Sequence, residues 1–454
     1  MRKLRAAVCC TLGIAVMTVA QSASAANWFE LQGISPALAP LVTVSGYLQP
    51  TYTYMPGTAV TDGLGSQVPH LNQIAPNFTS SNSFNINRAR LMIRGNINRN
   101  ISYFLAGEFG NNGFTHVGGN YTPSIIDGHV TFSHYIPFMR IEAGIIRAPG
   151  PEQAMQGYMA YNFTSFANVT TQMMLQPFYK PNPSTPYGNP NPQGGVAVPG
   201  QYGEGVNAFR YTGLEATNWF RNGPWEFTYG AMVGNFGPLT ATNYSNSPLI
   251  AARLQESYIF GGHGPFQSSL TGFIWYQHAT PNFNGHAYSM TRDGIGIAYM
   301  QGYMHQWGRW AKVEYMRGSG MISTSSVFSS PVTVAPAAQQ AALSEAQVYP
   351  GSQNTARGYY ISGGLFVTRR AEVDLRYDHY NRLPNIAIQN RTFNTWAVGL
   401  QYHFTPLTRV ILDYYVRNVG IPHLGAIPPA QRALPESIAN SADNALALQA
   451  VIAF

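Results

Sequence analysis

The last eleven residues of the chain, 444–454, have the pattern of a strand that crosses a membrane. Because side chains alternate across a strand, one face of this segment is wholly apolar, and its length suits a bilayer. A soluble protein would expose such a strand whenever its end frayed, whereas a membrane barrel needs one to pair with its first strand and remove the sheet edge. The segment therefore predicts a closed transmembrane β-barrel. The apolar residues of its one parity are Leu446, Leu448, Ala450, Ile452 and Phe454.

The N-terminus has the three parts of a secretory signal peptide. Residues 1–5 are basic, residues 6–20 form a short apolar core, and Ala23-Ser-Ala25 is a small-residue cleavage motif. Residues 1–25 are therefore predicted to be a signal peptide and not a transmembrane helix, which leaves 26–454 as an outer-membrane β-barrel porin domain. The predicted location is the outer membrane of a Gram-negative bacterium.

The composition excludes several other classes of protein. The chain is 45% hydrophobic and only 10% charged, against about 25% charged in soluble domains. Beyond residue 25 there is no run of 18 apolar residues that would predict a membrane helix. The only cysteines, Cys9 and Cys10, lie in the signal peptide, so the mature chain has no disulfide and no thiolate metal site. Three of the 26 Lys and Arg residues also lie in the signal peptide. The other 23, against 19 acidic residues, give the mature chain a net charge of +4, which is too small to indicate binding of nucleic acid.

Breaks between the expected strands alternate in length. Short breaks occur at 96–100, 136–138, 220–224, 261–266, 304–309, 368–371 and 404–408. Long polar stretches occur at 55–82, 111–124, 148–205, 235–250, 279–291, 318–356, 381–391 and 418–443. Outer-membrane barrels have short periplasmic turns and long external loops. The sequence therefore predicts an all-β, transmembrane antiparallel β-barrel of about 16 strands, a size that leaves an aqueous channel.

Most of the expected strands have a period of two. The segments 42–54, 225–233 and 408–417 each separate apolar from polar side chains, whereas 206–219 and 249–260 are less regular, with Glu256 on an apolar parity. Aromatic residues lie beside the short breaks and predict the interfacial girdles of a membrane barrel. A soluble β-sandwich would leave both the signal peptide and the chain end unexplained. These aromatic residues are Tyr135, Phe138, Trp219, Trp225, Trp307, Trp310, Tyr402 and Phe404.

Five arginines are candidate pore-lining, anion-binding residues. Arg88, Arg90 and Arg94 share one parity of a strand, and an arginine on the lipid face costs about 2–4 kcal/mol at the bilayer midplane, so they are expected to face the lumen. Arg140 and Arg147 lie on the strand 139–147, on opposite parities. Guanidinium groups in a narrow pore concentrate anions and bind phosphate or carboxylate. Alternatively, they neutralise carboxylates of the same lumen, which are predicted to be Glu108, Asp127, Glu142, Glu372, Asp374 and Asp378.

The longest gap, 148–205, is the third external loop, and its part from 176 to 200 is rich in Pro, Asn and Gly. Loops of this length are usually functional or disordered. We expect this loop to fold back into the barrel and narrow the pore. The alternative is a flexible external cap.

Other chemistry has little support in the sequence. Asp127 and His129 share a face and could begin a metal site, but no third ligand is evident. The hydrolase motifs Gly-x-Ser-x-Gly and Ser-x-x-Lys are missing, and Gly294-Ile-Gly296 lacks the later glycine of a phosphate-binding loop. The sequence thus predicts no catalytic residue, no metal and no cofactor.

Three segments together resemble the phosphate-selective porin family, porins O and P. They are 84–95, with its Arg-Ala-Arg core; 144–152, Gly-Ile-Ile-Arg-Ala-Pro-Gly-Pro-Glu; and 397–406, followed by Arg409 and Asp413-Tyr414. The resemblance implies a sixteen-stranded porin, commonly trimeric, that passes small anions. Phosphate-specific members also use lysines at the pore, and beyond the signal peptide this chain has only Lys180 and Lys312. A general anion-preferring channel therefore remains an equal alternative.

The predicted function is passive diffusion of small hydrophilic solutes, with a preference for anions that could include phosphate. The expected partners are outer-membrane lipid, small anions or other small solutes, and two further copies of the chain in a homotrimer. The alternatives are a barrel plugged by its loops that acts as an adhesin or structural protein, and a membrane-embedded hydrolase.

Overall fold

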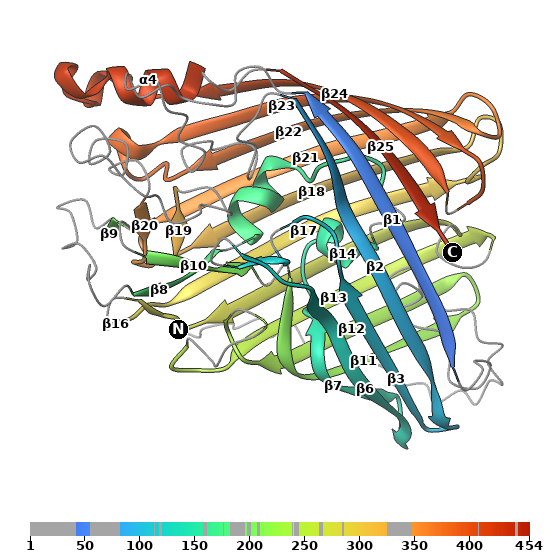
Figure 1. The fold of residues 1–454 in the computed structure, drawn as a ribbon. Coiled ribbons are helices and arrows are strands. Elements are labelled where there is room, and N and C mark those ends of the chain that lie inside the picture. The colour runs from blue at the N-terminus through green and yellow to red at the C-terminus, as the bar shows by residue number, and fades with distance from the viewer. Residues whose placement is uncertain are drawn as a thin grey trace, which may run out of the picture.

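In a computed structural model, the chain forms one closed barrel of sixteen antiparallel strands, as predicted (Figure 1). The structure describes residues 42–54, 82–112, 114–117, 120–157, 161–175, 177–181, 196–197, 201–206, 209–237, 239, 245–262, 267–283, 286–324, 347–406, 408–440 and 444–454. The predicted signal peptide lies outside the described residues. The barrel strands, each paired with its neighbours in this order, are β1 (Thr43–Tyr54), β2 (Asn82–Asn98), β3 (Ile101–Glu108), β6 (Ser124–Ile136), β7 (Met139–Arg147), β11 (Arg210–Asn222), β12 (Trp225–Gly234), β13 (Leu249–Gly261), β14 (Ser268–Ala279), β17 (Met290–Gln301), β18 (Arg309–Ser319), β21 (Thr355–Phe366), β22 (Ala371–Arg382), β23 (Arg391–His403), β24 (Arg409–Gly420) and β25 (Ala445–Ala453).

The remaining elements lie in the long connections between these strands. None of the helices among the described residues is long and apolar enough to cross a bilayer. The helices are α2 (Glu152–Met155), the π-helix η3 (Thr170–Met174), the 3-10 helices η5 (Ala387–Gln389), η6 (Leu424–Ala426) and η7 (Pro429–Gln431), and α4 (Ala433–Asn440). The small sheets pair β4 (His116–Val117) with β5 (Asn120–Tyr121), β8 (Pro177–Pro181) with β10 (Gln201–Val206), β15 (Asn282–Phe283) with β16 (His286–Ala287), and β20 (Gln347–Tyr349) with both β9 (Val196–Ala197) and β19 (Ile322–Ser323).

Short and long connections alternate around the barrel. Seven connections, from β2–β3 to β23–β24, are short, and eight, from β1–β2 to β24–β25, are long, which confirms the predicted alternation. In Figure 1 the short connections gather at the right-hand end, and α4 and the small sheet β8–β10 lie at the left-hand end. We name these the short-turn end and the long-loop end.

The chain end closes the barrel. β25 pairs with β24 on one side and with β1 on the other, so no sheet edge is left. At the junction the N–H groups of Gly46 and Phe454 donate to each other's carbonyl oxygens, at 2.9 and 3.0 Å. A Cβ at Gly46 would lie 2.5 Å from Phe454 Cζ and 2.6 Å from the Arg90 carbonyl oxygen. Only glycine therefore allows the terminal ring to approach β1 this closely.

Gly46→Val should weaken this closure. Moving the Phe454 ring would relieve only one of the two collisions, so we expect the barrel to lose about 1–3 kcal/mol, as over-packed sites do. Thermal unfolding followed by circular dichroism in detergent measures the change. Gly272→Val, on the outer face of β14 with no atom within 4 Å of the added Cβ, is the matched control and should leave the midpoint unchanged. Equal midpoints for both variants would show that the junction tolerates a side chain.

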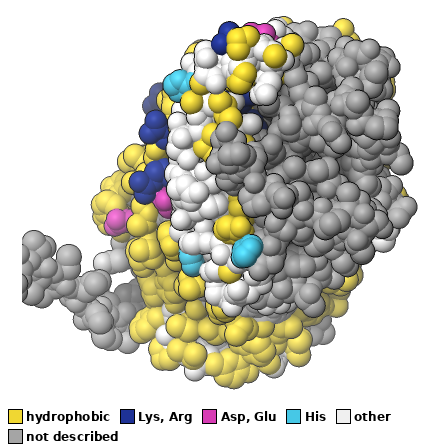
Figure 2. Space-filling model, turned by 90° about the vertical axis from the view of Figure 1, so that its left-hand side faces the viewer, with side chains coloured by type: hydrophobic (Ala, Val, Ile, Leu, Met, Phe, Trp, Pro, Cys, Tyr) yellow, Lys and Arg dark blue, Asp and Glu magenta, His cyan; other side chains and the backbone are white. Residues whose placement is uncertain are grey.

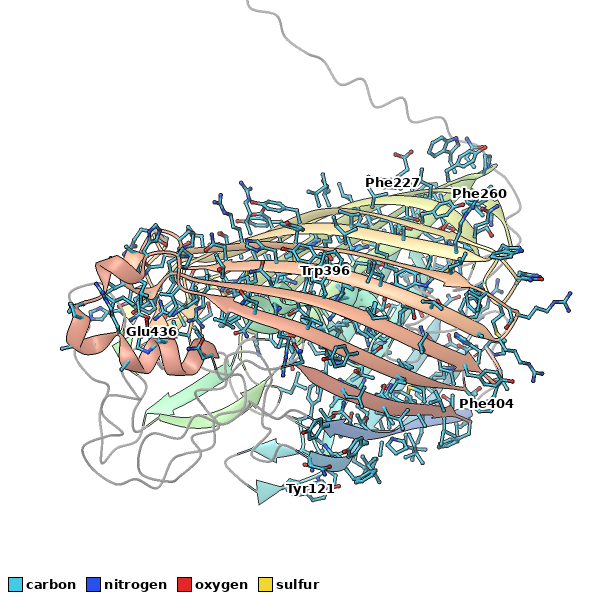
Figure 3. The ribbon with its side chains drawn as sticks, turned by 90° about the horizontal axis from the view of Figure 1, so that it is seen from above. Tyr121, Phe227, Phe260, Trp396, Phe404 and Glu436 are labelled. Atoms are coloured by element: carbon cyan, nitrogen blue, oxygen red, sulfur yellow. The ribbon has the colours of Figure 1, made fainter. Side chains whose placement is uncertain are left out.

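The wall has an apolar outer face and a polar inner face. Along β13, Ile250, Leu254 and Tyr258 are exposed on the outside, whereas Arg253 and Gln255 are buried on the inside. Aromatic side chains such as Phe227, Phe260, Trp396 and Phe404 are exposed on the outer surface (Figure 3). Glu256 belongs to the outer row as well, so the irregular parity seen in the sequence is a real feature of this wall.

Two of the predicted girdle aromatics face the lumen instead. Trp310 is 3% exposed, and its Nε1 donates to Glu372 at 2.5 Å. Trp219 lies on the inward parity of β11, and the guanidinium carbon of Arg140 is 5.2 Å from the centre of its ring. The girdle prediction was therefore wrong for these two residues, because proximity to a turn does not fix the face of the strand.

Candidate functional site: the barrel interior

The inner wall carries many ionisable groups. The largest fully buried side chains include seven arginines, which all lie on barrel strands. Arginines of the inner wall form ion pairs with carboxylates of the same wall: Arg90 with Glu108 at 2.6 Å, Arg210 with Asp127 at 2.8 Å, and Arg376 with Asp378 at 3.2 Å. Part of the interior charge is thus neutralised locally. This agrees with the second interpretation of the sequence, in which lumen arginines neutralise carboxylates of the same wall.

A β-bulge sets the direction of the first arginine cluster. Phe84 and Ile86 are exposed on the outer face of β2, and the register with β1 shifts between them and Arg88. The extra residue reverses the parity, so Arg88, Arg90 and Arg94 lie on the inward parity of β2. Arg88 Nη1 donates to Gln49 on β1 at 2.9 Å.

The five predicted arginines have different surroundings. Arg88 donates to an amide, Arg90 is paired with a carboxylate, and Arg147, at the end of β7, donates to the carbonyl oxygens of Met155 and Gln156 at 2.9 and 3.1 Å. Arg94 and Arg140 form no ion pair with any described residue. Glu142, two positions further along β7, offsets part of the charge of Arg140.

His129 and Asp127 do not form the start of a metal site. Asp127 is paired with Arg210, and His129 Nε2 lies 3.8 Å from Glu142. Within the part of the chain that the structure describes, no group of three His, Cys, Asp or Glu side chains could hold a metal ion.

The long loop after β7 enters the barrel and crosses to the far wall. The carbonyl oxygen of Pro149 accepts from Gln277 on β14 at 2.9 Å, and that of Gly150 accepts from Arg253 on β13 at 2.7 Å. Arg253 also pairs with Glu152, the first residue of α2, at 2.7 Å. The Glu152 N–H donates to Glu314 on β18 at 3.2 Å. The start of the loop is thus tied to three strands of the wall.

The next described part of the loop, 161–168, is held by buried polar groups of β22 and β24. Arg376 donates to the Ser165 carbonyl at 2.7 Å, and the Thr164 N–H donates to Asp413 at 2.6 Å. Asn168 Nδ2 donates to Asp378 at 2.6 Å, and Arg409 donates to the Tyr161 carbonyl. Several of these bonds involve an ionised group, which strengthens them.

Apolar packing fixes the last part of the loop, 167–175. A Cβ at Gly358 on β21 would lie 2.8 Å from Val169 Cβ, so the loop passes close to the wall there. The loop residues Ala167, Val169, Met173, Met174 and Leu175 form one buried cluster with wall residues that include Phe273, Trp275, Met316, Tyr360 and Phe393. This segment is packed as a protein core and not as a free cap.

The loop and three of the arginines lie on different parts of the wall. In the ring of sixteen strands, the wall residues that anchor the loop run from β13, the eighth strand, to β24, the fifteenth, whereas Arg88 and Arg94 lie on the second strand and Arg140 on the fifth. Arg147 at the end of β7 and Phe209 before β11 also contact the loop, so it reaches the arginine side at the end of β7. The described loop residues 148–157 and 161–175 contain one charged side chain, Glu152, which Arg253 neutralises. No described loop carboxylate therefore opposes the arginines.

The Glu152 anchor should survive mild acid. Burial raises the pKa of this carboxyl, but the charges of Arg253 and Lys312 and its hydrogen bonds outweigh burial and hold the pKa below the usual 4.5. A depressed carboxyl pKa contributes stability above the unfolded-state pKa, and that stability is lost as the pH falls through the folded-state pKa. We expect the Glu152–Arg253 ion pair to stay intact from pH 8 to about 5, so single-channel conductance in this range should differ between the parent and Glu152→Gln.

Glu152→Gln tests this assignment, because it removes the charge at every pH. At neutral pH the Glu152→Gln variant should have a noisier single-channel conductance than the parent, because its loop has lost the ion pair with Arg253. The parent should show the same noise only when the pH falls below the pKa of Glu152. Equal conductance noise for the parent and Glu152→Gln at neutral pH would rule out Glu152 as an anchor of the loop.

The loop anchors could not be identified directly from the sequence. Arg376, Arg409 and Asp413 have the inward parity that any lumen residue has, and their partners are backbone groups of a loop some 210 to 250 positions earlier in the chain. The one available signal was an excess of charged residues on the inner parity of β22 and β24.

Comparison with known proteins supports the fold alone. No protein-family model matches the sequence, and no curated protein sequence matches it. Among solved structures, the barrel is similar to Salmonella typhi OmpF in complex with daunomycin, with a TM-score of 0.53, 11% identity, and 91% of this chain and 97% of that chain covered. It is also similar to the outer membrane channel DcaP of Acinetobacter baumannii (TM-score 0.49, 9% identity, 91% and 97% covered) and to an anion-selective porin from Comamonas acidovorans (TM-score 0.47, 12% identity, 91% and 99% covered).

The likeness to OmpF, together with the closed ring of sixteen strands, shows the fold of an outer-membrane porin. The resemblance to porins O and P stays a prediction, because no family match carries it.

Proposed function

We propose that this chain is a porin of the Gram-negative outer membrane, through which small hydrophilic solutes diffuse passively with a preference for anions. The observation that carries the proposal is the in-folded loop: its described residues 148–157 and 161–175 pack along the wall from β13 to β24, and Arg88, Arg94 and Arg140 lie on the part of the wall from β2 to β7. Such a loop narrows a wide barrel to a bore in which fixed charges act at short range. In this arrangement the short-turn end is periplasmic and the long-loop end is external.

The anion preference follows from the charges on either side of the bore. Arg88, Arg94 and Arg140 contribute positive charge on one side, and the loop presents uncharged side chains on the other. Glu142 and Glu215, which are partners in register on β7 and β11, lie on the arginine side and reduce the field there. We therefore expect a moderate preference for anions and not exclusion of cations.

Planar-bilayer recording of the mature chain, residues 26–454, separates the three functional classes. A porin gives stepwise conductance, whereas a plugged barrel gives none, and a membrane-embedded hydrolase releases fatty acid from the bilayer lipid. Heat-denatured protein in the same detergent is the control for detergent-induced leaks. Folded protein that inserts without conductance steps would refute the proposal.

Phosphate selectivity is tested in the same bilayer. If phosphate binds in the bore, millimolar phosphate reduces the chloride current as it occupies the arginine side. If the channel is a general one, the chloride current is unchanged. A homotrimer, which the family resemblance implies, predicts conductance in groups of three steps and a trimer mass in detergent.

A further inference from the structure

The outer face of the wall carries charge where a membrane barrel should be apolar. Arg317 on β18 is 63% exposed on this face, and its Nη2 lies 2.9 Å from Asp293 on β17. Arg357 on β21 is exposed on the same face, directly opposite Arg317 in register. Figure 2, which faces the long-loop end, shows basic and acidic side chains together on one outer flank beside hydrophobic ones.

The position of these groups along the strands defines their depth. Arg317 is the third residue from the long-loop end of β18, and Arg357 is the third residue of β21. The next outward row toward the short-turn end holds Tyr315 and Tyr359, and the row after it holds Val313 and Ile361. The outer face thus changes from charged to aromatic to aliphatic, the order of headgroup, interface and hydrocarbon in a bilayer.

The charge at this depth is not balanced within the described chain. Asp293 offsets Arg317, but Arg357 has no ion-pair partner among the described residues. Like charges directly opposite each other on neighbouring strands destabilise a sheet. An anion between the two guanidinium groups would remove that repulsion, and guanidinium groups bind phosphate through paired N–H donors.

The neighbouring strands β22 and β23 carry hydroxyl, imidazole and amide groups on the same outer face as the two arginines. Tyr377 OH donates to Asn394 Oδ1 at 3.1 Å, and His379 Nδ1 lies 2.7 Å from the same oxygen. The rings of Tyr359 and His379 are 5.6 Å apart. This network gives the flank a polar surface that suits a sugar or phosphate headgroup better than acyl chains.

We propose that Arg317 and Arg357 form a binding site for the phosphate groups of a lipid in the outer leaflet. The lipid's acyl chains would lie along the aliphatic rows below, and its phosphate would bridge the two guanidinium groups. The site rests on the proposed membrane location, but not on conduction through the barrel. It would hold a charged lipid at one flank, β17 to β22, and leave the rest of the outer wall to ordinary apolar contact.

The test measures lipid binding to the purified barrel in neutral detergent, with diphosphorylated lipid A as the probe and native mass spectrometry as the readout. Each arginine near a charged lipid surface contributes roughly five-fold in affinity, so the double variant Arg317→Gln, Arg357→Gln should bind about 30-fold more weakly. Arg309→Gln is the matched control, because Arg309 is exposed at the short-turn end of β18, the strand that carries Arg317. It should bind as the parent does.

Two further arms identify the ligand. Dephosphorylated lipid A should bind the parent and the double variant equally weakly. Pyrophosphate in solution should not compete at the concentration of the lipid, and competition there would overturn the assignment to a lipid. Equal binding of lipid A by the parent and the folded double variant would overturn the site itself. Conductance of the double variant should match that of the parent, so a failure of lipid binding and a failure of the porin proposal give different results.

Discussion

Replacing residues 157–176 by a short Gly-Ser linker should raise the single-channel conductance about two-fold or more, because current scales with the free cross-section of the bore. The segment fills part of the lumen along β17 to β24 and is held there by Arg376, Asp378 and Asp413. Its removal exposes these ionised groups to water, where they remain solvated. The wall does not depend on the loop, since every barrel strand pairs with two neighbours. Recording in symmetric potassium chloride gives the measurement.

A deletion at the rim is the control for this experiment. The helix α4 lies at the long-loop end, where it packs against β24 and η7 (Figure 1). Its removal should leave the conductance unchanged. If both deletions raise the conductance equally, the increase comes from loss of any external chain, and the loop 161–175 is not the constriction.

The architecture could be predicted because its signals are local. A period of two separates Val410, Leu412 and Tyr414 from Arg409 and Asp413 within one strand, and the structure places the two sets on opposite faces. The lengths of the breaks give the number of strands and the two ends of the barrel without any knowledge of contacts. Glu256 falls on the apolar parity of its segment, and this made the strand assignment look irregular. In the structure Glu256 does face outward, so the alternation assigned its face correctly.

The interior could be predicted only in part, because its contacts join distant segments. The loop was expected to enter the barrel, and the sequence drew attention to its Pro-, Asn- and Gly-rich part, 176–200, yet the described residues that pack inside are 148–157 and 161–175. Proline and glycine mark a loop, but the anchoring depends on carbonyl groups such as those of Gly150 and Ser165, which any residue supplies. Residues 182–195 lie outside the described part of the chain.

The direction of aromatic side chains was the other limit. Trp307 lies in the short connection before β18 and is 66% exposed, whereas Trp310, on β18, is 3% exposed. Three positions separate them across a turn, and the turn geometry, not the residue type, sets where the inward parity begins. Sequence alone does not contain that geometry.

Neutralising Arg94 and Arg140 together should move the reversal potential toward cation preference. Perfect selectivity gives about 59 mV for a tenfold gradient of a monovalent salt, and we expect the double variant Arg94→Gln, Arg140→Gln to shift by roughly 10 mV or more. These two arginines form no ion pair with the described residues, and only Arg140 has a carboxylate near it on its own strand, Glu142, so their removal leaves the negative charge of this wall less opposed. Glu142 and Glu215 then dominate that wall and attract potassium.

Two single variants give this experiment its controls. Arg357→Gln removes the same charge from the outer face and should leave the reversal potential at the parent value. Arg90→Gln should mainly reduce stability, by about 3–5 kcal/mol, because it leaves Glu108 buried without its partner. An unchanged potential in the double variant would take Arg94 and Arg140 out of the selectivity filter. If Arg357→Gln shifts the reversal potential as much as the double variant does, the potential depends on the total surface charge of the protein. The anion preference could then not be assigned to Arg94 and Arg140.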